Sequence, residues 1–512
     1  MRVPGIAFFT YTRPIMKKQA LLSLLLAALL LTGTACGSED TKDTAANTND
    51  TAADTESATT ETETETLYAD HLPDDLDFGG ATVRIHTRGD EDSLMEVAVD
   101  ELNGDVLNDA IYNRNARVSE RLNVVLERVD GAGWADYGTE LSKIKASITA
   151  GDNAYQCIAA WNAYVSPLAL ENCFQDLSTL SYLETDMPWW NQTSVQSMAM
   201  GGKLLFLTGD ISFLTSFGGA YVLFTNDRVA EDNNVPSIPD MVRDGTWTLD
   251  NMLSITKSIY NDVDGNGVMD EKDTYGYITD YYNAVDSWYT ASDIHQITLD
   301  DNYMPVYTPQ LEKVSGLVDK LYPMFYNGSL VGAYYTDAGT QMDMFKNGQA
   351  LMILRELDNA RSYFRDMEDN YTINPLPKYD EAQNGYYSNT YTGATIWCIP
   401  TDNPEPETAA AVMEALAADS YANVMLAYFE TCLQGKLSRN EDTVDMLEVI
   451  RKGAVADIEY LYAFILGAPH YVMRDVLSDK NASTNVASWY AKNNERIQAQ
   501  IETTIETIRN MQ

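Results

Sequence analysis

The residues best suited to hold a cation lie in one acidic, glycine-containing stretch at 262–273. Most of its oxygen-bearing side chains follow the spacing of an EF-hand loop: Asp262, Asp264, Asn266, Asp270, Glu271 and Asp273. In such a loop a glycine at position six, here Gly267, permits a sharp turn, and position seven, here Val268, supplies its backbone carbonyl. Ca²⁺ is held by six to eight oxygens, so this density of donors favours calcium over an acidic turn without an ion.

Two details of this loop define the kind of site we expect. Position twelve holds Asp273 instead of the usual glutamate, so its arm is shorter, and Glu271 could supply the last oxygens. The segment that follows, Tyr275 to Thr279, does not have a helical pattern. The sequence therefore predicts an isolated calcium loop that stabilises a turn, not a helix-loop-helix sensor.

Other chemistry-bearing residues form no recognisable catalytic motif. The four histidines are scattered, and HExxH, the phosphate-binding loop, GxSxG and GxGxxG are all absent. Four cysteines follow position 100 without a CxxC pair or zinc-site spacing: Cys157, Cys173, Cys398 and Cys432. Buried thiols and disulfides both remain open for them, since an exported protein can form bridges. The sequence gives no support for nucleophilic or zinc catalysis, so we expect a protein that is not an enzyme.

The amino terminus resembles a bacterial lipoprotein signal. Residues 1–35 carry four cations and no acid, and Ala20 to Leu31 is an apolar run of signal-peptide length, too short to span a bilayer comfortably. The small residues 32–35 then precede Cys36, which would carry diacylglycerol after cleavage. Gly33 stands where the motif usually has leucine. Met16 is an alternative start, which would make residues 1–15 an extension.

Residues 36–74 form an acidic low-complexity tether without the apolar content needed for a core. The whole chain is also strongly acidic, with 34 Lys and Arg against 76 Asp and Glu and a net charge of −42. Such a charge repels nucleic-acid backbones and anionic lipid surfaces. We therefore expect no nucleic-acid partner, and membrane contact through the lipid anchor only, on the outer face of the cell membrane.

The elements of the body alternate between strand and helix patterns. Residues 81–87, 123–129 and 155–161 are predicted strands, separated by helical faces beginning at Leu107 and Leu141. Strand patterns return at 204–208, 220–225, 349–357, 371–376 and 394–400, and helices follow at 406–418, 421–433 and the carboxyl terminus. This order is typical of an α/β protein with parallel sheets, and 512 residues suggest two or three domains.

Several of these features together resemble the extracellular solute-binding proteins of bacterial ABC importers, in the sugar-binding family 1 group. The lipoprotein signal, the acidic tether and a calcium loop ending in Tyr-Gly carry the resemblance, with Asp77-Phe-Gly-Gly80, Gly202-Lys-Leu204, Asp244-Gly-Thr-Trp-Thr-Leu249 and Leu376-Pro-Lys-Tyr-Asp380. It covers most of residues 75–512. The resemblance implies a two-lobed periplasmic-binding-protein-like fold of type II, with a mostly parallel sheet flanked by helices in each lobe.

The family layout places the first lobe at 75–222 plus 343–392 and the second at 225–342 plus 394–512. Ligand would bind in a cleft near the strand ends, where aromatic rings stack on sugars and polar groups bond hydroxyls. The residues nominated for this cleft are Arg88, Trp161, Asn162, Asp210, Trp288, Tyr289, Glu356 and Tyr391. Each could instead be structural: Trp161 in the core, Asp210 as a helix cap, Arg88 as a surface charge, or Glu356 paired with Arg355 or Arg361.

The function implied by the resemblance is capture of a carbohydrate, with an oligosaccharide as the expected ligand, and its delivery to an ABC permease by a monomer. Two alternatives stay open. A surface glycoside hydrolase needs only two carboxylates about 5–9.5 Å apart, and this acidic chain has many. The same fold could also bind peptides or other polar solutes, or act in adhesion or sensing, because a fold does not fix a function.

Overall fold

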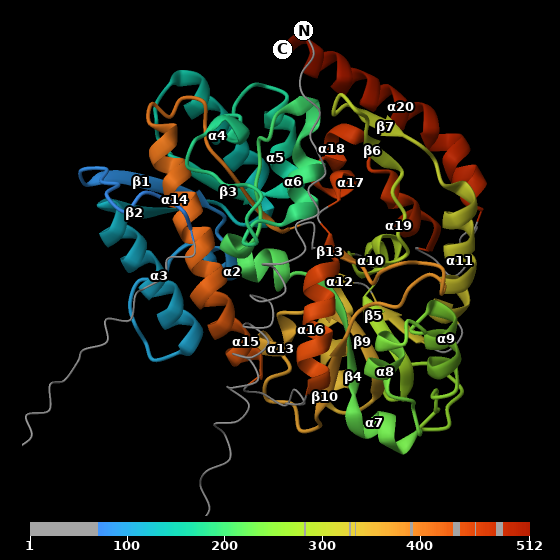
Figure 1. The fold of residues 1–512 in the computed structure, drawn as a ribbon. Helices are drawn as coiled ribbons and strands as arrows, with labels where there is room; N and C mark the ends of the chain where they lie inside the picture. The colour runs from blue at the N-terminus through green and yellow to red at the C-terminus, as the bar shows by residue number, and fades with distance from the viewer. Residues whose placement is uncertain are drawn as a thin grey trace, which may run out of the picture.

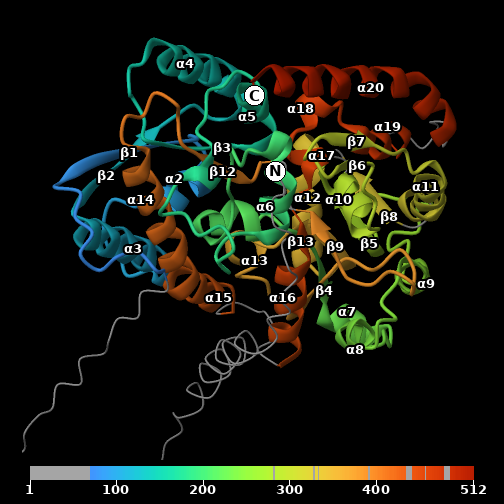
Figure 2. The same ribbon diagram turned by 45° about the horizontal axis from the view of Figure 1, so that its top comes forward.

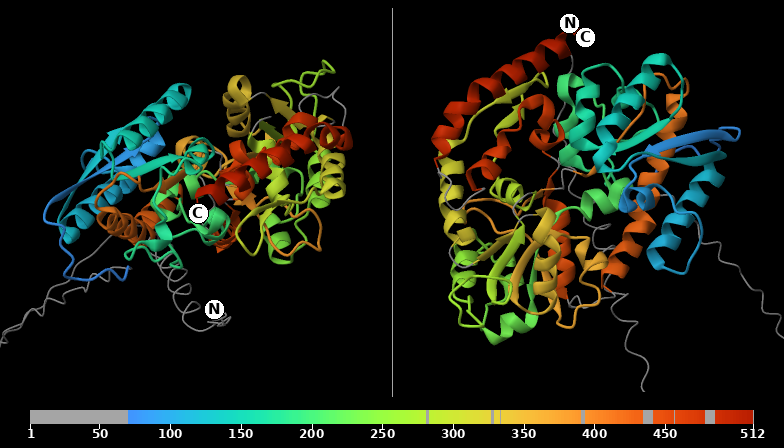
Figure 3. Two further views of the ribbon diagram at one scale, coloured as in Figure 1. Left: turned by 90° about the horizontal axis from the view of Figure 1, so that it is seen from above. Right: turned by 180° about the vertical axis from the view of Figure 1, so that it is seen from behind.

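The computed structural model describes residues 70–280, 283–326, 329–332, 334–389, 393–433, 441–455, 457–477 and 485–511. The predicted signal peptide, Cys36, most of the tether and Tyr391 lie outside these ranges. Two separate sheets with their helices form two lobes side by side (Figure 1), and a view from above shows the same division (Figure 3).

The first lobe is built on a four-stranded sheet of order β12-β3-β1-β2. β1 (Ala81–Thr87) pairs in parallel with β2 (Val124–Asp130) and β3 (Cys157–Trp161), whereas β12 (Thr395–Cys398) runs antiparallel to β3. Every residue of β3 is buried, which explains its unbroken apolar run, because helices cover both faces of a parallel sheet. The predicted strands 81–87, 123–129 and 155–161 are confirmed to within two residues.

The second lobe is built on a five-stranded sheet of order β10-β4-β9-β5-β8. β5 (Tyr275–Asp280) pairs in parallel with β8 (Ser329–Gly332) and β9 (Ala350–Glu356). β4 (Tyr221–Asn226) runs antiparallel to both β9 and β10 (Tyr371–Asn374). Each sheet is therefore mostly parallel with one antiparallel strand, as expected for the two-lobed fold.

The predicted distribution of later segments between the lobes is wrong. Residues 343–392 were assigned to the first lobe, but β9 and β10 belong to the second sheet. Residues from 394 onward were assigned to the second lobe, but β12 pairs with β3 of the first. An apolar strand pattern reports burial, not which sheet provides the partner, so the sequence could not distinguish the two arrangements.

Helices surround both sheets. In the first half these are α2 (Glu91–Val97), α3 (Val106–Leu122), α4 (Tyr137–Ala150), α5 (Asn162–Ala169), α6 (Gln192–Met198), α7 (Asp227–Asp232), α8 (Ile238–Arg243), α9 (Leu249–Lys257), α10 (Asn283–Ala291), α11 (Leu311–Tyr326) and α12 (Tyr334–Lys346). Later helices are α13 (Asn359–Ser362), α14 (Pro406–Asp419), α15 (Met425–Leu433), α16 (Glu441–Gly453), α17 (Ile458–Leu461), α18 (Ala463–Leu466), α19 (Val472–Leu477) and α20 (Val486–Met511). Short strands β6 (Ile297–Leu299) and β7 (Pro305–Tyr307) form a hairpin, and β11 (Ser388–Asn389) pairs with β13 (Ala454–Val455).

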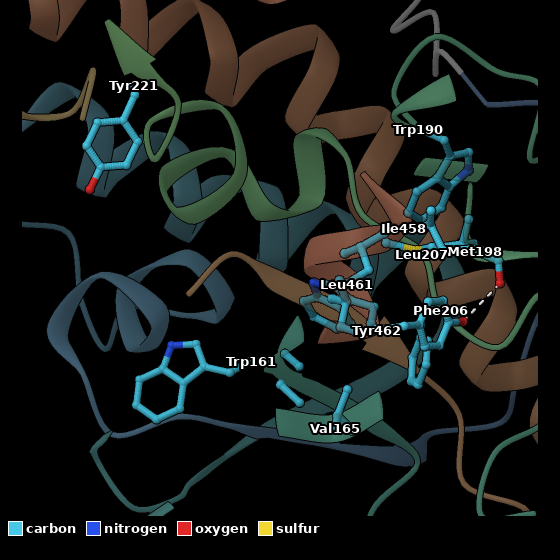
Figure 4. Packing of buried hydrophobic residues seen from close by; sticks show 14 of the residues in the cluster. Trp161, Val165, Trp190, Met198, Phe206, Leu207, Tyr221, Ile458, Leu461 and Tyr462 are labelled. Atoms are coloured by element: carbon cyan, nitrogen blue, oxygen red, sulfur yellow. Dashed lines mark hydrogen bonds between the residues drawn. The ribbon is translucent and has the colours of Figure 1, made fainter. Parts of the chain in front are cut away.

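The carboxyl-terminal helices connect the two lobes. α17 and α18 pack on α5 of the first lobe, while α19 packs on α10 and α20 on α11 of the second. Figure 2 shows α20 lying along the top of the second lobe, with its carboxyl end reaching the edge of the first. Close by, Ile458, Leu461 and Tyr462 point toward Val165 and Phe206 (Figure 4), and the Tyr462 hydroxyl donates to the Met198 carbonyl at 3.0 Å.

Two helix ends are capped by residues whose types favour that role. The Thr248 side chain accepts from the Asn251 N–H at the start of α9, and Gly151 ends α4 with a φ of 74°. Residues 204–208 form only an isolated bridge between Leu207 and Trp397 instead of a strand. A π-helical turn, Ser420–Val424, interrupts the helix predicted over 421–433.

Cys157, Cys173 and Cys398 are buried free thiols, so the disulfide alternative is excluded for these three. The Cys432 side chain lies outside the described ones. Among the described residues, the helices are all too short or too polar to cross a bilayer.

Candidate functional site

Five aromatic side chains gather beside the carboxyl end of β3, and we refer to them as the aromatic cluster: Trp134, Tyr137, Trp161, Tyr164 and Phe464. Trp134 lies in the turn after β2, Tyr137 begins α4, and Tyr164 belongs to α5. The Trp134 ring centroid is 5.0 Å from that of Trp161 and 4.9 Å from that of Tyr164. Phe464 of α18 completes the cluster, 5.1 Å from Tyr164.

The aromatic cluster has an exposed and a buried layer. Trp134 is 49% exposed and Phe464 is 44% exposed, whereas Trp161 is only 5% exposed. The ring centroids of Trp161 and Tyr137 are 4.5 Å apart, and the Tyr137 hydroxyl accepts from the Trp161 backbone N–H. The Trp161 ring points away from Ile458, Leu461 and Tyr462 (Figure 4). Large rings left half in water while their partners hold them rigid offer apolar faces for a flat ligand. The exposed layer is therefore the surface on which a sugar ring could stack.

Arg88, nominated as a hydroxyl-binding residue, lies beneath this cluster. Its side chain is almost fully buried, and the guanidinium carbon lies 4.5 Å from the Trp161 ring centroid. The guanidinium also donates to Ser93 Oγ, to the Gly393 carbonyl and to Thr395 Oγ1. Arg88 is thus neither a surface charge nor exposed to a ligand, but it supports the ring of Trp161.

Asn162 and Asp210 also lie near the ends of first-lobe elements. Asn162 is buried, and its backbone N–H donates to the Ala394 carbonyl at 3.2 Å. Asp210 accepts from Arg451 of α16 at 2.6 Å, and Arg451 also lies over the Tyr421 ring. Burial raises the pKa of the Asp210 carboxyl to about 6, which the charge of Arg451 partly opposes. Asp210 forms a salt bridge between the lobes instead of capping a helix.

The second-lobe nominees occupy different surroundings. Glu356, at the end of β9, is half-buried and accepts from the Tyr221 hydroxyl at 2.8 Å, while Arg355 and Arg361 pair with other acids. Trp288 and Tyr289 of α10 are completely buried, and the Tyr289 hydroxyl donates to Glu459 at 2.8 Å. The structure therefore places Glu356 at a strand edge and Trp288 and Tyr289 in the core.

Four members of the aromatic cluster were not predicted as functional: Trp134, Tyr137, Tyr164 and Phe464. A tryptophan in a glycine-flanked turn directly after a strand, at Gly131-Ala-Gly-Trp134, is a signal that could have identified the first. Phe464 lies more than 300 positions from Trp161, and only tertiary packing reveals that they belong together.

The acidic loop at 262–273 closes on itself between α9 and β5. Backbone bonds between Asn261 and Thr274 close its base. Asp262 accepts from the Gly265 and Gly267 N–H groups at 2.8 Å, and Gly267 has a φ of 73°. The left-handed turn expected of the glycine at position six is therefore present.

Three carboxylates of this loop converge. Oxygens of Asp262, Asp264 and Asp273 all lie within 4.8 Å of one another, a spacing that ligands about 2.4 Å from one cation would have. Asp270 and Glu271 are not part of this group: Asp270 accepts from the Lys272 N–H at 2.9 Å. These carboxylate oxygens fit a hard divalent cation such as Ca²⁺. The residues that would hold such an ion are Asp262, Asp264 and Asp273.

Known proteins match this chain in structure but not by family profile or curated sequence. No protein-family profile and no curated protein sequence match the chain. Solved structures do match. The GacH receptor of Streptomyces glaucescens, solved unliganded and with acarbose, is 12% identical, with a TM-score of 0.52 over 83% of this chain and 99% of that one. The galacto-N-biose-/lacto-N-biose I-binding protein of the Bifidobacterium longum ABC transporter is 10% identical, with a TM-score of 0.51 over 84% and 98%.

The chain has the fold of the two-lobed sugar-binding solute-binding proteins. This confirms the fold and the structural resemblance that the sequence motifs indicate. At 10–12% identity, the likeness establishes a solute-binding fold and nothing finer. A structure described as a designed esterase matches equally well, at 12% identity and a TM-score of 0.52 over 82% of this chain and 99% of that one. The solute-binding fold by itself therefore does not decide between binding and catalysis.

Proposed function

We propose that the protein captures a neutral oligosaccharide between its lobes and delivers it to the permease of an ABC importer. The observation that carries this proposal is the pair of half-exposed rings, Trp134 and Phe464, held by the aromatic cluster at the carboxyl end of β3. In open α/β folds ligands bind beside the carboxyl ends of strands. The solute-binding fold and the sugar complexes of its structural relatives support the same class of ligand.

Several parts of this proposal rest on the sequence. The lipobox-like segment before Cys36 supports anchoring to the outer face of the cell membrane, with the acidic tether holding the lobes away from it. A net charge of −42 supports a neutral cargo over an anionic one. We infer a monomer that binds its ligand without chemistry, as the absence of catalytic sequence motifs suggests.

The test is titration calorimetry of the purified protein with maltotriose, lacto-N-biose, cellotriose and trialanine, with each sugar recovered and analysed by chromatography. We expect one sugar to bind and to be recovered intact. Trp134→Ala should raise its Kd about tenfold, which corresponds to ~1.4 kcal/mol, because a ring face is lost. Tyr112→Ala, which removes an exposed ring from α3, is the matched control and should leave Kd unchanged.

Three results would contradict the proposal. Cleavage of a sugar would establish a carbohydrate-active enzyme, and binding of trialanine alone would establish a peptide-binding protein. Binding of a sugar with the same Kd in wild type and Trp134→Ala would show that the aromatic cluster is not the site.

We also propose that residues 262–273 bind one Ca²⁺ in a structural role. The convergence of Asp262, Asp264 and Asp273 supports it, as does the left-handed Gly267. The loop joins α9 to β5, so a bound ion would neutralise the repulsion among its acids and hold the entry to a central strand.

Thermal unfolding with 1 mM CaCl₂ or with a chelator tests this second proposal. A cation that binds only the folded protein raises Tm, so the chelator should lower it. Asp264→Ala should abolish the difference, whereas Asp301→Ala, an exposed acid in another turn, should retain it. An equal Tm with calcium and with chelator in the wild type would show that the loop is an acidic turn only.

A further inference from the structure

Arg88 lies where the aromatic cluster meets two of the chain segments that join the lobes. The first connection leaves the first lobe through the π-helical turn Phe213–Phe217 and enters β4. The second returns through Gly393 into β12. Arg88 contacts the second connection directly, through the Gly393 carbonyl and Thr395 Oγ1, the latter at 3.2 Å.

The two connections are bonded to each other beside Arg88. The Thr395 N–H donates to Thr215 Oγ1 at 3.0 Å, which links β12 to the π-helical turn. Glu96 of α2 then holds that turn from the other side, because it accepts from the Thr215 N–H at 2.9 Å and from the Thr215 hydroxyl at 3.1 Å. Glu96 is fully buried, so the link is shielded from competing water.

The opposite face of Arg88 supports the aromatic cluster. Its guanidinium lies over Trp161, which in turn packs against the half-exposed Trp134. A buried guanidinium whose donors are fixed by hydrogen bonds cannot move without disturbing either the ring above it or the backbone below it. A force applied to Trp134 therefore has a continuous packed route to Thr395 and Thr215.

We propose that Arg88 is the positioning residue that couples occupancy of the aromatic cluster to these two interlobe connections, so that a ligand on Trp134 tightens the hinge. The coupling to ligand rests on the proposed function, whereas the physical link between Arg88 and the connections does not. The chain offers a matched control four positions earlier, in β1: Arg84 donates to the Ala154 and Asn153 carbonyls within the first lobe and makes no bond to the described residues of either connection.

The test is hydrogen exchange of peptides covering residues 211–221 and 393–400, which contain the amides of Thr215 and Thr395. Without any ligand, Arg88→Met should speed exchange in both peptides by about tenfold, because both amides donate within the network that Arg88 holds. Arg88→Lys should restore part of the protection, and Arg84→Met should leave both peptides at the wild-type rate. Thr395→Val, which removes one acceptor of Arg88 while keeping the side-chain shape, is the second variant should Arg88→Met fail to fold.

The second arm adds the sugars of the titration panel, maltotriose, lacto-N-biose and cellotriose. In wild type the bound sugar should slow exchange in both peptides, and in Arg88→Met this slowing should disappear even at saturating sugar. Unchanged ligand-free exchange in Arg88→Met and Thr395→Val would overturn the physical link. Slowing by sugar that persists in Arg88→Met would overturn the coupling. If none of the sugars binds the wild type, the proposed function and the ligand coupling fail together, while the first arm still decides the link.

Discussion

At the residue scale, burial separates residues that could touch a ligand from those that hold the fold. Trp288 and Trp134 are both tryptophans, but one is completely buried and the other is half-exposed. Arg88 is buried and fully engaged, whereas the sequence alone suggested a side chain open to hydroxyls. Residue type therefore nominates candidates, and their exposure decides among them.

Trp288→Ala is expected to destabilise the protein without acting on a binding surface. Removing a completely buried indole from α10 leaves a cavity in the second lobe, which should cost about 3–5 kcal/mol. Urea unfolding measures this loss, and Trp134→Ala is the comparison, since it should lose less than about 1 kcal/mol. Equal losses in the two variants would contradict the assignment of exposed and core tryptophans.

Glu96 is expected to make stability depend on pH. Burial raises the pKa of its carboxyl to about 7, which the bonds from Thr215 and Thr395 and the charge of Arg88 only partly oppose, while Arg114 donates to its backbone carbonyl. A raised pKa means that the folded state holds the proton more tightly. The stability this provides is complete below about pH 4.5 and is lost as pH rises through 7.

Glu96→Gln, which stays neutral, should therefore gain stability relative to wild type between pH 5 and pH 8, by about 2–3 kcal/mol. Urea unfolding of both proteins at several pH values measures the difference. Glu101→Gln, at an exposed carboxyl, is the control and should follow the wild-type profile. Parallel profiles for Glu96→Gln and wild type would show that this carboxyl does not titrate on unfolding in that range.

At the element scale, the backbones of α9 and β5 approach each other closely. This close approach fixes where the acidic loop, which joins the two elements, meets the second sheet. Gly276 lies in β5 where a Cβ atom would come within 2.0 Å of the Thr256 carbonyl oxygen at the end of α9. That distance is far inside van der Waals contact, so only glycine allows α9 and β5 to pack as they do. The acidic loop at 262–273 joins these same two elements.

Gly276→Ala should consequently lower the free energy of unfolding by about 1–3 kcal/mol, because strand or helix must shift. It should also weaken the response of Tm to calcium, since the loop ends would move apart. Gly138→Ala in α4 is the matched control: a Cβ there meets nothing within 4 Å, and alanine should be neutral or stabilising by up to about 1 kcal/mol. A Gly276→Ala protein as stable as wild type would contradict the close packing.

At the scale of the whole molecule, contacts between the lobes are both covalent and noncovalent. Besides the connections near Arg88, Arg451 of α16 reaches the first lobe, where it pairs with Asp210 and lies over Tyr421. α16 itself is attached to the second lobe, since Arg243 of α8 pairs with Asp442 and Asp445. The Asp210–Arg451 pair is therefore a bridge between the halves that a hinge motion would stretch.

Arg451→Met is expected to loosen this bridge. Small-angle X-ray scattering of the ligand-free protein should show a larger radius of gyration than in wild type, with a lower Tm because Asp210 is left buried without its partner. Arg243→Met, which breaks exposed pairs within the second lobe, should leave the radius of gyration unchanged. An unchanged radius in Arg451→Met would mean that the pair does not hold the lobes.

The sequence by itself determined the local elements and the chemistry they carry. The strand patterns at 81–87, 155–161 and 349–357 and the spacing of the acidic loop each depend on residues close together in the chain, so periodicity and local spacing were sufficient. Only the tertiary structure decided which sheet received β9, β10 and β12, which tryptophan stayed exposed, and that Phe464 lies beside Tyr164. These outcomes depend on pairing between segments far apart in sequence, and a strand or ring pattern carries no record of its partner.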